Sequence, residues 1–251
     1  MNSAPETNIS LADLPQGDLF KEMIDAGVFY GRKKSKTNPK MKLYLFGNRG
    51  GVEIIDLAKT LEGLESAQSF VKEISRQGGS ILFVGTQPAS LKIVEVAKEL
   101  NYPVVPRRWV GGTLTNFKVI KERIQHFQKL STDLVSGALS KYTKKERLMM
   151  EREKNRLQEL LGGLEPLERL PAAMIVIDPT LHASAVHEAR RMKVPVVALS
   201  NMDTDPDKIE YVVAGNTAAR PSVEWFLGKL KEAILAGAAE RSVVASPKVE
   251  K

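Results

Sequence analysis

The chain has 251 residues and a formal net charge of +7 at pH 7, from 37 Lys and Arg against 30 Asp and Glu. A hydrophobic content of 43% is enough for a folded core, and this length predicts one large domain or one domain carrying an insertion. Cysteine is absent, which excludes disulfides, thiolate nucleophiles and thiolate metal sites. The basic excess favours a polyanionic partner, such as nucleic acid or an anionic membrane surface.

The first twenty residues lack both the apolar run of a secretion signal and the Arg/Ser-rich pattern of a transit peptide. No stretch approaches the roughly 20 apolar residues that span a bilayer. We therefore expect a soluble, cytoplasmic protein without a membrane partner.

The N-terminal region predicts a short helix, a basic loop and a hairpin. Residues 18–26 have a helical pattern that ends at Gly27. The loop that follows contains Arg32, Lys33, Lys34, Lys36, Lys40 and Lys42. Residues 43–46 and 52–55 are apolar runs of strand length, and the glycine-rich residues 47–51 between them predict a hairpin turn.

Alternating helices and strands come next. Asp56 is expected to cap a helix that stops at Gly78 and Gly79. Residues 80–84 form a continuous apolar strand, typical of a parallel sheet that is covered on both faces. Pro88 opens another helix, and residues 103–105 form the next strand.

Residues 117–163 interrupt this alternation and predict an inserted helical hairpin. Ile120, Ile124, Phe127, Leu130 and Leu134 recur at steps of three and four, a narrow stripe typical of one arm of a coiled-coil-like hairpin. The second arm is expected to begin at a capping box, Thr143 with Glu146, and to end at Gly162 and Gly163. Its middle is entirely polar, so the hairpin should project from the sheet.

The alternation then resumes to the end of the chain. Strands are expected at 172–177, 195–199 and 211–213, with helices at 183–192 and 221–235. The order predicts an α/β fold with a doubly wound, mostly parallel sheet. We expect residues 1–116 and 164–237 to form the α/β domain, residues 117–163 the inserted hairpin, and residues 238–251 a flexible tail.

The segment 107–116, Arg-Arg-Trp-Val-Gly-Gly-Thr-Leu-Thr-Asn, combines guanidinium groups, an indole, glycines and hydroxyl or amide side chains. These groups can contact phosphate, stack on a base and let the backbone approach a sugar. The alternative is a loop between a strand and a helix in which Trp109 belongs to the core and the arginines are solvated. The segment alone does not decide between them.

The motifs of nucleotide-binding and catalytic α/β proteins are missing. The turn at Gly85-Thr86-Gln87-Pro88 lacks the glycine spacing of a dinucleotide site, and no P-loop lysine follows Gly111-Gly112-Thr113. His182 and His187 are five residues apart, which points two ligands in different directions on a helix. We expect no cofactor, no metal and no catalytic residue.

Two aspartate features allow a functional and an ordinary interpretation. Asp178 lies at a strand end, where catalytic residues of α/β proteins occur, but we favour a helix cap. Asp203, Asp205 and Asp207 could hold a hard cation, yet the glycine and glutamate of an EF-hand loop are missing, and we favour turn chemistry.

Several motifs in order resemble a known family. They are Ala26-Gly27-Val28, Asn38-Pro39-Lys40-Met41, Ile55-Asp56-Leu57, Leu82-Phe83-Val84-Gly85-Thr86, Arg108-Trp109-Val110-Gly111-Gly112-Thr113-Leu114-Thr115-Asn116, Leu161-Gly162-Gly163, Val176-Ile177-Asp178 and Val213-Ala214-Gly215-Asn216. Together with Thr143-Lys144-Lys145-Glu146 in the hairpin, they are similar to the bacterial-type second protein of the small ribosomal subunit. The resemblance runs from about residue 18 to residue 235.

The resemblance implies a structural protein of the small subunit, located between head and body, that supports translation without catalysis. It implies contacts with small-subunit ribosomal RNA and neighbouring ribosomal proteins, including the large first protein that captures messenger RNA. The residues that it carries over as RNA contacts are Asn38, Lys40, Arg108, Trp109, Gly111, Gly112, Thr113 and Asn116, with Pro39 beside them. From charge and position we add Arg32, Lys33, Lys34, Lys36, Arg107, Lys144 and Lys145. Near the tip of the hairpin we also expect Lys141 and Arg147 to contact ribosomal RNA or a neighbouring protein.

The chain departs from the family pattern at three places. Phe29 and Arg32 stand where many relatives have histidines, so any role of those imidazoles is lost. Gln87 and Pro88 replace basic residues after Gly-Thr, and Thr217 and Ala218 replace two aspartates. The rival hypothesis is a nucleotide- or sugar-phosphate-binding α/β enzyme with a pocket at the carboxyl ends of the strands.

Overall fold

A computed structural model describes residues 17–136 and 142–245 of the chain. Its centre is a parallel sheet of five strands in the order β5-β4-β6-β7-β8. The strands of this sheet are β4 (Ile81–Val84), β5 (Val104–Val105), β6 (Ala173–Ile177), β7 (Val196–Ser200) and β8 (Tyr211–Ala214). A separate antiparallel sheet in the order β1-β3-β2 consists of β1 (Tyr30–Lys33), β2 (Leu45–Arg49) and β3 (Val52–Ile55).

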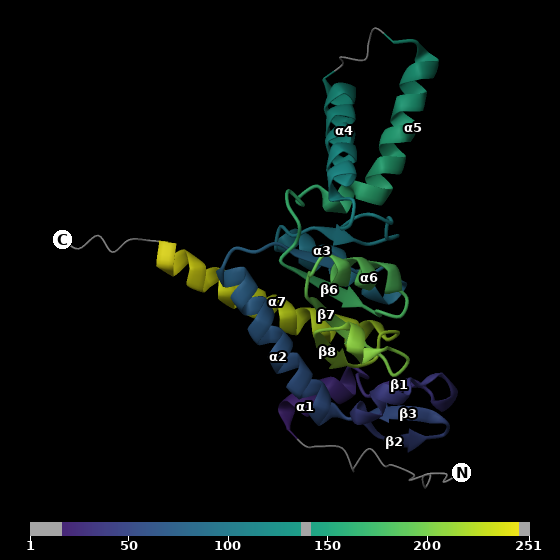
Figure 1. The fold of residues 1–251 in the computed structure, drawn as a ribbon, viewed down its shortest axis with the longest axis vertical. Coiled ribbons are helices and arrows are strands. Elements are labelled where there is room, and N and C mark those ends of the chain that lie inside the picture. The colour runs from purple at the N-terminus through teal and green to yellow at the C-terminus, as the bar shows by residue number, and fades with distance from the viewer. Residues whose placement is uncertain (1–16, 137–141, 246–251) are drawn as a thin grey trace, which may run out of the picture.

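Seven α-helices are described in these residues, most of them around the parallel sheet (Figure 1). They are α1 (Asp18–Asp25), α2 (Leu57–Arg76), α3 (Lys92–Glu99), α4 (Phe117–Val135), α5 (Lys144–Leu161), α6 (Ala183–Arg191) and α7 (Arg220–Ala245). Short 3-10 turns are η2 (Lys34–Lys36), η3 (Pro39–Tyr44), η4 (Pro88–Ser90), η6 (Gly162–Leu164) and η7 (Pro206–Lys208).

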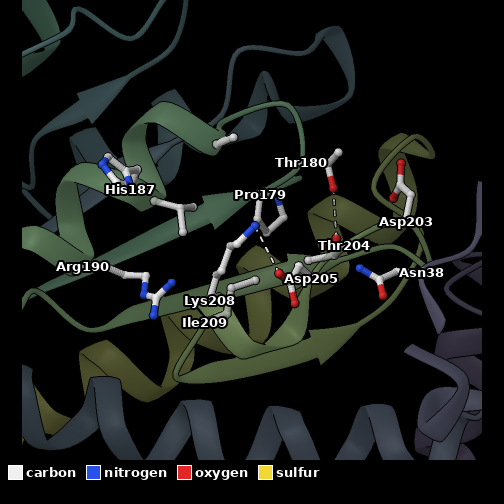
Figure 2. Close-up of a pocket in the computed structure, with 12 residues that line it drawn as sticks. Asn38, Pro179, Thr180, His187, Arg190, Asp203, Thr204, Asp205, Lys208 and Ile209 are labelled. Atoms are coloured by element: carbon white, nitrogen blue, oxygen red, sulfur yellow. Dashed lines mark hydrogen bonds and ion pairs between the residues drawn. The ribbon is translucent and has the colours of Figure 1, made fainter. Parts of the chain in front are cut away.

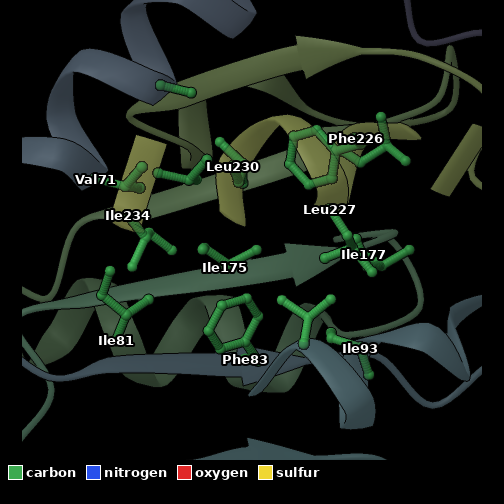
Figure 3. Packing of buried hydrophobic residues seen from close by; sticks show 14 of the residues in the cluster. Val71, Ile81, Phe83, Ile93, Ile175, Ile177, Phe226, Leu227, Leu230 and Ile234 are labelled. Atoms are coloured by element: carbon green, nitrogen blue, oxygen red, sulfur yellow. The ribbon is translucent and has the colours of Figure 1, made fainter. Parts of the chain in front are cut away.

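The two faces of the parallel sheet bury two different clusters. On one face, α2, α3 and α7 pack over strand residues such as Phe83 and Ile175, with Phe226 and Leu230 of α7 above them (Figure 3). On the other face, α6 packs with Leu82 and Val176. Helices therefore cover both faces, which confirms the predicted doubly wound α/β fold and explains why almost all residues of the parallel strands are apolar.

The inserted segment forms two helices that stand out from the sheet (Figure 1). Ile120, Ile124, Phe127 and Leu130 of α4 are buried, as their spacing predicts. Ile120, Ile124 and Leu161 also belong to the cluster under the sheet. The base of the hairpin is thus part of the core of the α/β domain. The expected division at residues 117 and 163 is corrected accordingly, because only the outer part of this segment projects from the domain. Its coiled-coil character stays a prediction.

Three local expectations need correction. The basic loop contains strand β1, because Tyr30 pairs with Ile54 and Lys33 with Val52. The first hairpin strand starts at Leu45, since a 3-10 turn occupies residues up to Tyr44. Helix α7 continues to Ala245, so most of the segment predicted as a flexible tail is helical, and residues 246–251 lie outside the described part of the chain.

Candidate nucleic-acid interface

The loop at residues 107–116, which we call the Trp109 loop, is organised around one carboxylate on α6. The indole nitrogen Nε1 of Trp109 donates to Glu188 Oε1 at 2.9 Å, and the Gly112 backbone N–H donates to the same oxygen at 2.9 Å. The backbone N–H groups of Leu114 and Thr115 donate to Glu188 Oε2 at 3.0 and 3.1 Å, and the Thr115 hydroxyl adds another bond at 3.1 Å. Glu188 is only 8% exposed.

These bonds set the ionisation of Glu188. Burial of the carboxyl works to raise its pKa, but the hydrogen bonds from Trp109, Gly112, Thr115 and Leu114 outweigh burial and hold the pKa below its ordinary value. A charged, buried acceptor with several donors is strongly held in place. The carboxylate therefore fixes the conformation of the loop between Trp109 and Thr115.

Trp109 and Thr113 face the interior of the protein. Trp109 packs against the cluster that contains Leu114 and is partly buried. Thr113 is 1% exposed, and its hydroxyl donates to the Val110 carbonyl at 2.6 Å. Both side chains were expected to contact RNA. Because their polar atoms already have partners inside the protein, the structure gives Trp109 and Thr113 a structural role, and Thr113 has no accessible side chain to offer.

The two glycines of the loop differ. Gly112 has φ = 89°, which favours glycine, and an added Cβ would lie 3.3 Å from the Cβ of Asn116. Gly111 has open space around the position of a Cβ. Gly112 is therefore required by the loop itself, whereas Gly111 is free for a partner to approach.

Arg107, Arg108 and Asn116 face outward from the loop. All three are exposed. Arg107 lies 3.5 Å from Glu159 of α5, so its charge is partly compensated at the base of the hairpin. Arg108 forms no ion pair with the residues that the structure describes.

Arg32 was predicted to contact phosphate, but its guanidinium group points into the protein. Its Nη2 lies 3.2 Å from Asp178 Oδ2, and its Nε lies 3.5 Å from Asp203 Oδ2. With two carboxylates in contact, this guanidinium ties β1 to the ends of β6 and β7. We therefore remove Arg32 from the proposed phosphate contacts.

Asp178 is the buried partner at the carboxyl end of β6. Its Oδ2 also accepts from Gln87 Nε2 at 2.9 Å and from the Thr217 hydroxyl at 3.0 Å. Its backbone has φ = 63°, an uncommon conformation for a residue with a side chain. Asp178 is not the N-cap residue of α6, which is His182, but Asp178 Oδ1 accepts from the Leu181 backbone N–H at 3.2 Å and so caps the turn that leads into this helix.

This arrangement fills the place where open α/β sheets bind ligands. The strand order reverses between β4 and β6, and such a switch point is the usual ligand crevice. Here Gln87, which follows β4, is bonded to Asp178, which follows β6. The crevice is occupied by protein side chains.

The remaining basic residues of the N-terminal region divide into free and paired groups. Lys33, Lys34 and Lys36 are exposed and make no ion pair with any described residue. Lys40 pairs with Asp205 at 3.2 Å and also with Asp207. Asn38 accepts from the Lys40 backbone N–H at 3.0 Å, which caps the turn η3.

The aspartates 203, 205 and 207 are thus engaged by cationic side chains. Arg32 contacts Asp203, and Lys40 contacts the other two. Within the described residues, no group of three or more His, Cys, Asp or Glu side chains is arranged to hold a metal ion. None of the helices in residues 17–136 and 142–245 has the length and apolar character to cross a membrane.

The tip of the hairpin carries the last predicted contacts. Lys144, Lys145 and Arg147 are exposed at the start of α5. The predicted capping box is confirmed, because Thr143 Oγ1 accepts from the Glu146 backbone N–H and Glu146 accepts from the Thr143 backbone N–H. Lys141 lies outside the described residues.

The candidate residues therefore form separate surfaces. The Trp109 loop lies beside the base of the hairpin, whereas β1 and the lysines after it belong to the small antiparallel sheet (Figure 1). Sequence analysis missed Glu188. Its position three residues after Ala185, on the buried face of α6, was the available signal.

Comparison with known proteins identifies the family. Residues 23–237 match the family model described as "Ribosomal protein S2". The chain is 40% identical over 223 residues to the "Small ribosomal subunit protein uS2" of one strain of Thermus thermophilus, covering 88% of this chain and 87% of the relative. The protein of the same name from a second strain of that organism matches equally. The chain belongs to the ribosomal protein S2 family.

Membership of the ribosomal protein S2 family settles the class of function. A ribosomal protein S2 is a structural protein of the small ribosomal subunit and not an enzyme. The resemblance stated from sequence motifs is thereby confirmed, and the rival hypothesis of a nucleotide-binding enzyme is wrong.

Proposed function

We propose that this chain, as a component of the small ribosomal subunit in the cytoplasm, binds small-subunit ribosomal RNA through separate basic surfaces. The first is the basic segment, Lys33, Lys34 and Lys36. The second is the outward side of the Trp109 loop, with Arg107, Arg108, Gly111 and Asn116. Phosphate contacts of this kind position a protein on RNA without reading its sequence.

The observation that carries the proposal is the difference between paired and unpaired cations. Arg32 and Lys40 are engaged by aspartates, but the three lysines between them form no ion pair among the described residues, and only Lys36 acts on an acidic residue, Asp203, through its charge. A solvated surface usually mixes charges of both signs. A run of exposed lysines without ion pairs, held on an ordered strand and turn, suits a phosphate backbone.

The hairpin is proposed as a third contact. Its base is fixed in the core by Ile120, Ile124 and Leu161, while Lys144 and Lys145 lie at the far end of α5. An arm with a rigid base can reach RNA or a neighbouring ribosomal protein at a distance. We also propose contacts with neighbouring small-subunit proteins between head and body, including the large first protein that captures messenger RNA.

Cosedimentation with small subunits tests the proposal. Subunits that lack this protein are mixed with the purified chain at increasing salt, and the bound fraction is measured after sedimentation. The logarithm of the binding constant should fall linearly with the logarithm of the salt concentration, because basic side chains that contact phosphates displace the counterions of the RNA. A chain that stays in the supernatant at low salt while the subunits remain intact would contradict the proposed function.

A further inference from the structure

A pocket with a volume of about 550 Å³ opens beside the filled crevice, between α6 and the turn η7 (Figure 2). It lies at the carboxyl ends of β6 and β7, because Pro179 and Thr180 follow β6 and Asp205 follows β7. Its size falls within the roughly 300 to 1,000 Å³ of small-molecule sites. Figure 2 shows that His187 and Arg190 lie at one end and that Asn38 and Asp203 lie at the other.

The end formed by α6 is cationic. His187 and Arg190 are three residues apart, so they share one face of the helix, and both are exposed. Neither side chain has a hydrogen bond or an ion pair with the described residues. A guanidinium without an acidic partner is suited to bidentate contact with a phosphate.

Apolar side chains line the middle of the pocket. Val186 and Ile209 are 3% and 8% exposed, and Pro179 lies near them. Such surfaces can cover the face of a planar ring without hydrogen-bond requirements of their own. The pocket can therefore hold a flat group between its polar ends.

The opposite end offers one donor and several acceptor positions. The Asn38 amide nitrogen has no hydrogen-bond partner among the described residues, since only its oxygen is used, by the Lys40 backbone. Each carboxylate oxygen of Asp205 accepts from one lysine, Lys40 or Lys208, and keeps a further lone pair. Donors and acceptors side by side match the Watson–Crick edge of a base.

We propose that this pocket binds one unpaired nucleotide of ribosomal RNA, with its base against the apolar wall that includes Val186 and Ile209 and a flanking phosphate on Arg190. The inference rests on the proposed function. It is supported by continuity with the basic segment, because Asn38 follows Lys36 by two residues and lines the pocket. A strand whose phosphates lie on those lysines reaches the pocket at its next nucleotides, and single-stranded RNA is recognised by this kind of extruded base.

Site-directed crosslinking tests the inference. The chain contains no cysteine, so Thr180→Cys at the exposed rim creates a unique thiol for a maleimide-benzophenone label. Small subunits assembled with the labelled chain are irradiated, and reverse-transcription stops map the product. We expect a crosslink that concentrates at one unpaired nucleotide.

Three further substitutions in the labelled chain define the site. Ala183 lines the pocket and is exposed, so Ala183→Trp should fill the pocket and abolish the crosslink in each assembled subunit. Arg190→Gln should reduce the yield, whereas Arg191→Gln, which changes the neighbouring exposed charge outside the pocket, should leave the yield per subunit unchanged. Thermal unfolding of each variant checks that α6 remains folded.

The outcomes separate this inference from the proposed function. If the labelled chain enters subunits but crosslinks only to a ribosomal protein, or crosslinks to RNA equally well with Ala183→Trp, the nucleotide pocket is refuted and RNA binding stands. Binding of free mononucleotides to the isolated chain, without an RNA crosslink, would also refute it, because the pocket would then serve a soluble ligand. A chain that fails to enter subunits at all contradicts the proposed function instead.

Discussion

The indole of Trp109 and the carboxylate of Glu188 are joined by a hydrogen bond of 2.9 Å across the space between the Trp109 loop and α6. The same carboxylate accepts from backbone N–H groups further along the loop, including that of Gly112. Trp109 is thereby an anchor that points inward, and its neighbours Arg107 and Arg108 are left on the outside. From the sequence, Trp109 is the side chain best suited to stack on a base. In the structure it anchors the loop, and this leaves Arg107 and Arg108 exposed.

Glu188→Gln should destabilise the folded protein. A glutamine has one acceptor oxygen and would turn its amide nitrogen toward N–H donors, so several bonds to a charged acceptor are lost. Hydrogen bonds to charged groups contribute about 1.5 to 3 kcal/mol, and we expect a loss of at least this size in urea unfolding. Glu232→Gln, on the exposed side of α7, is the matched control and should be close to neutral. Equal stability of the two variants would contradict an anchoring role.

The same carboxyl predicts a pH dependence of stability. Because the pKa of Glu188 is lower in the folded chain than its ordinary value of 4.5, folding favours the ionised form. Its contribution is therefore complete above pH 4.5 and is lost as the pH falls through the lowered folded-state value. In urea unfolding across this acidic range, the stability difference between the wild-type chain and Glu188→Gln should shrink. A difference that grows on acidification would overturn the assignment.

The basic segment and Arg32 should behave in opposite ways. Replacing Lys33, Lys34 and Lys36 together with Gln should leave the unfolding free energy almost unchanged. It should also flatten the salt dependence of subunit binding by roughly 0.7 to 0.9 log units per lost phosphate contact. An unchanged slope would show that these lysines are merely solvated.

Arg32→Gln is the companion variant. It removes the cation beside the buried Asp178, so it should lower stability by about 1 to 3 kcal/mol, less than for a fully buried pair because Arg32 is partly exposed. Thermal and urea unfolding measure this loss. A stable Arg32→Gln variant with a reduced salt slope would instead return Arg32 to the phosphate contacts.

Gly111 and Gly112 form a matched pair of alanine substitutions. Gly112→Ala should cost about 1 to 2 kcal/mol of stability, since the alanine would need a positive φ beside the Asn116 Cβ. Gly111→Ala meets open space and should not affect unfolding. If RNA approaches the backbone at Gly111, Gly111→Ala should weaken binding to the small subunit without lowering the stability of the protein. Full binding by this variant would exclude a close approach at Gly111.

Shortening the hairpin should separate its two roles. Replacing residues 128–156 with a glycine linker keeps Ile120, Ile124 and Leu161 in the core, so the α/β domain should remain folded by circular dichroism. Removing all of 117–163 loses these buried side chains and should destabilise the protein by roughly 1.5 to 3 kcal/mol for each. Undiminished subunit binding by the shortened chain would leave the arm without a binding role.

The strand and helix pattern could be predicted because each element has a local signal. The apolar runs of β4, β6 and β7, the capping Asp56 and the capping box at Thr143 all appear in the structure as expected. Periodicity also located the inserted hairpin. The burial of the hairpin's base could not be predicted. The apolar stripe of α4 has the same spacing where it faces α5 and where it faces the sheet, so the sequence does not mark the boundary between the two parts.

The direction of side chains at the candidate site was much harder to predict. Arg32 and Lys33 are adjacent and equally basic, yet β1 turns one toward Asp178 and leaves the other exposed. That choice depends on a carboxylate far away in the sequence. The same holds for Glu188, whose partners lie on a loop more than seventy positions earlier. Charge patterns locate basic segments, and only the fold decides which cations remain free.

Strand β4, which lies next to the edge strand β5 in the parallel sheet, gains its second neighbour only late in synthesis. It pairs with β5 on one side, but its other neighbour, β6, comes only after the entire inserted hairpin. In the same way, α2 packs along α7, the last helix of the chain. Contacts between such distant segments form slowly, because a long loop must close before they contribute. During synthesis, a partly made copy therefore exposes the edge of β4 until β6 emerges, and the apolar side of α2 until α7 emerges. We expect chaperones that bind exposed apolar surface to bind this incomplete chain.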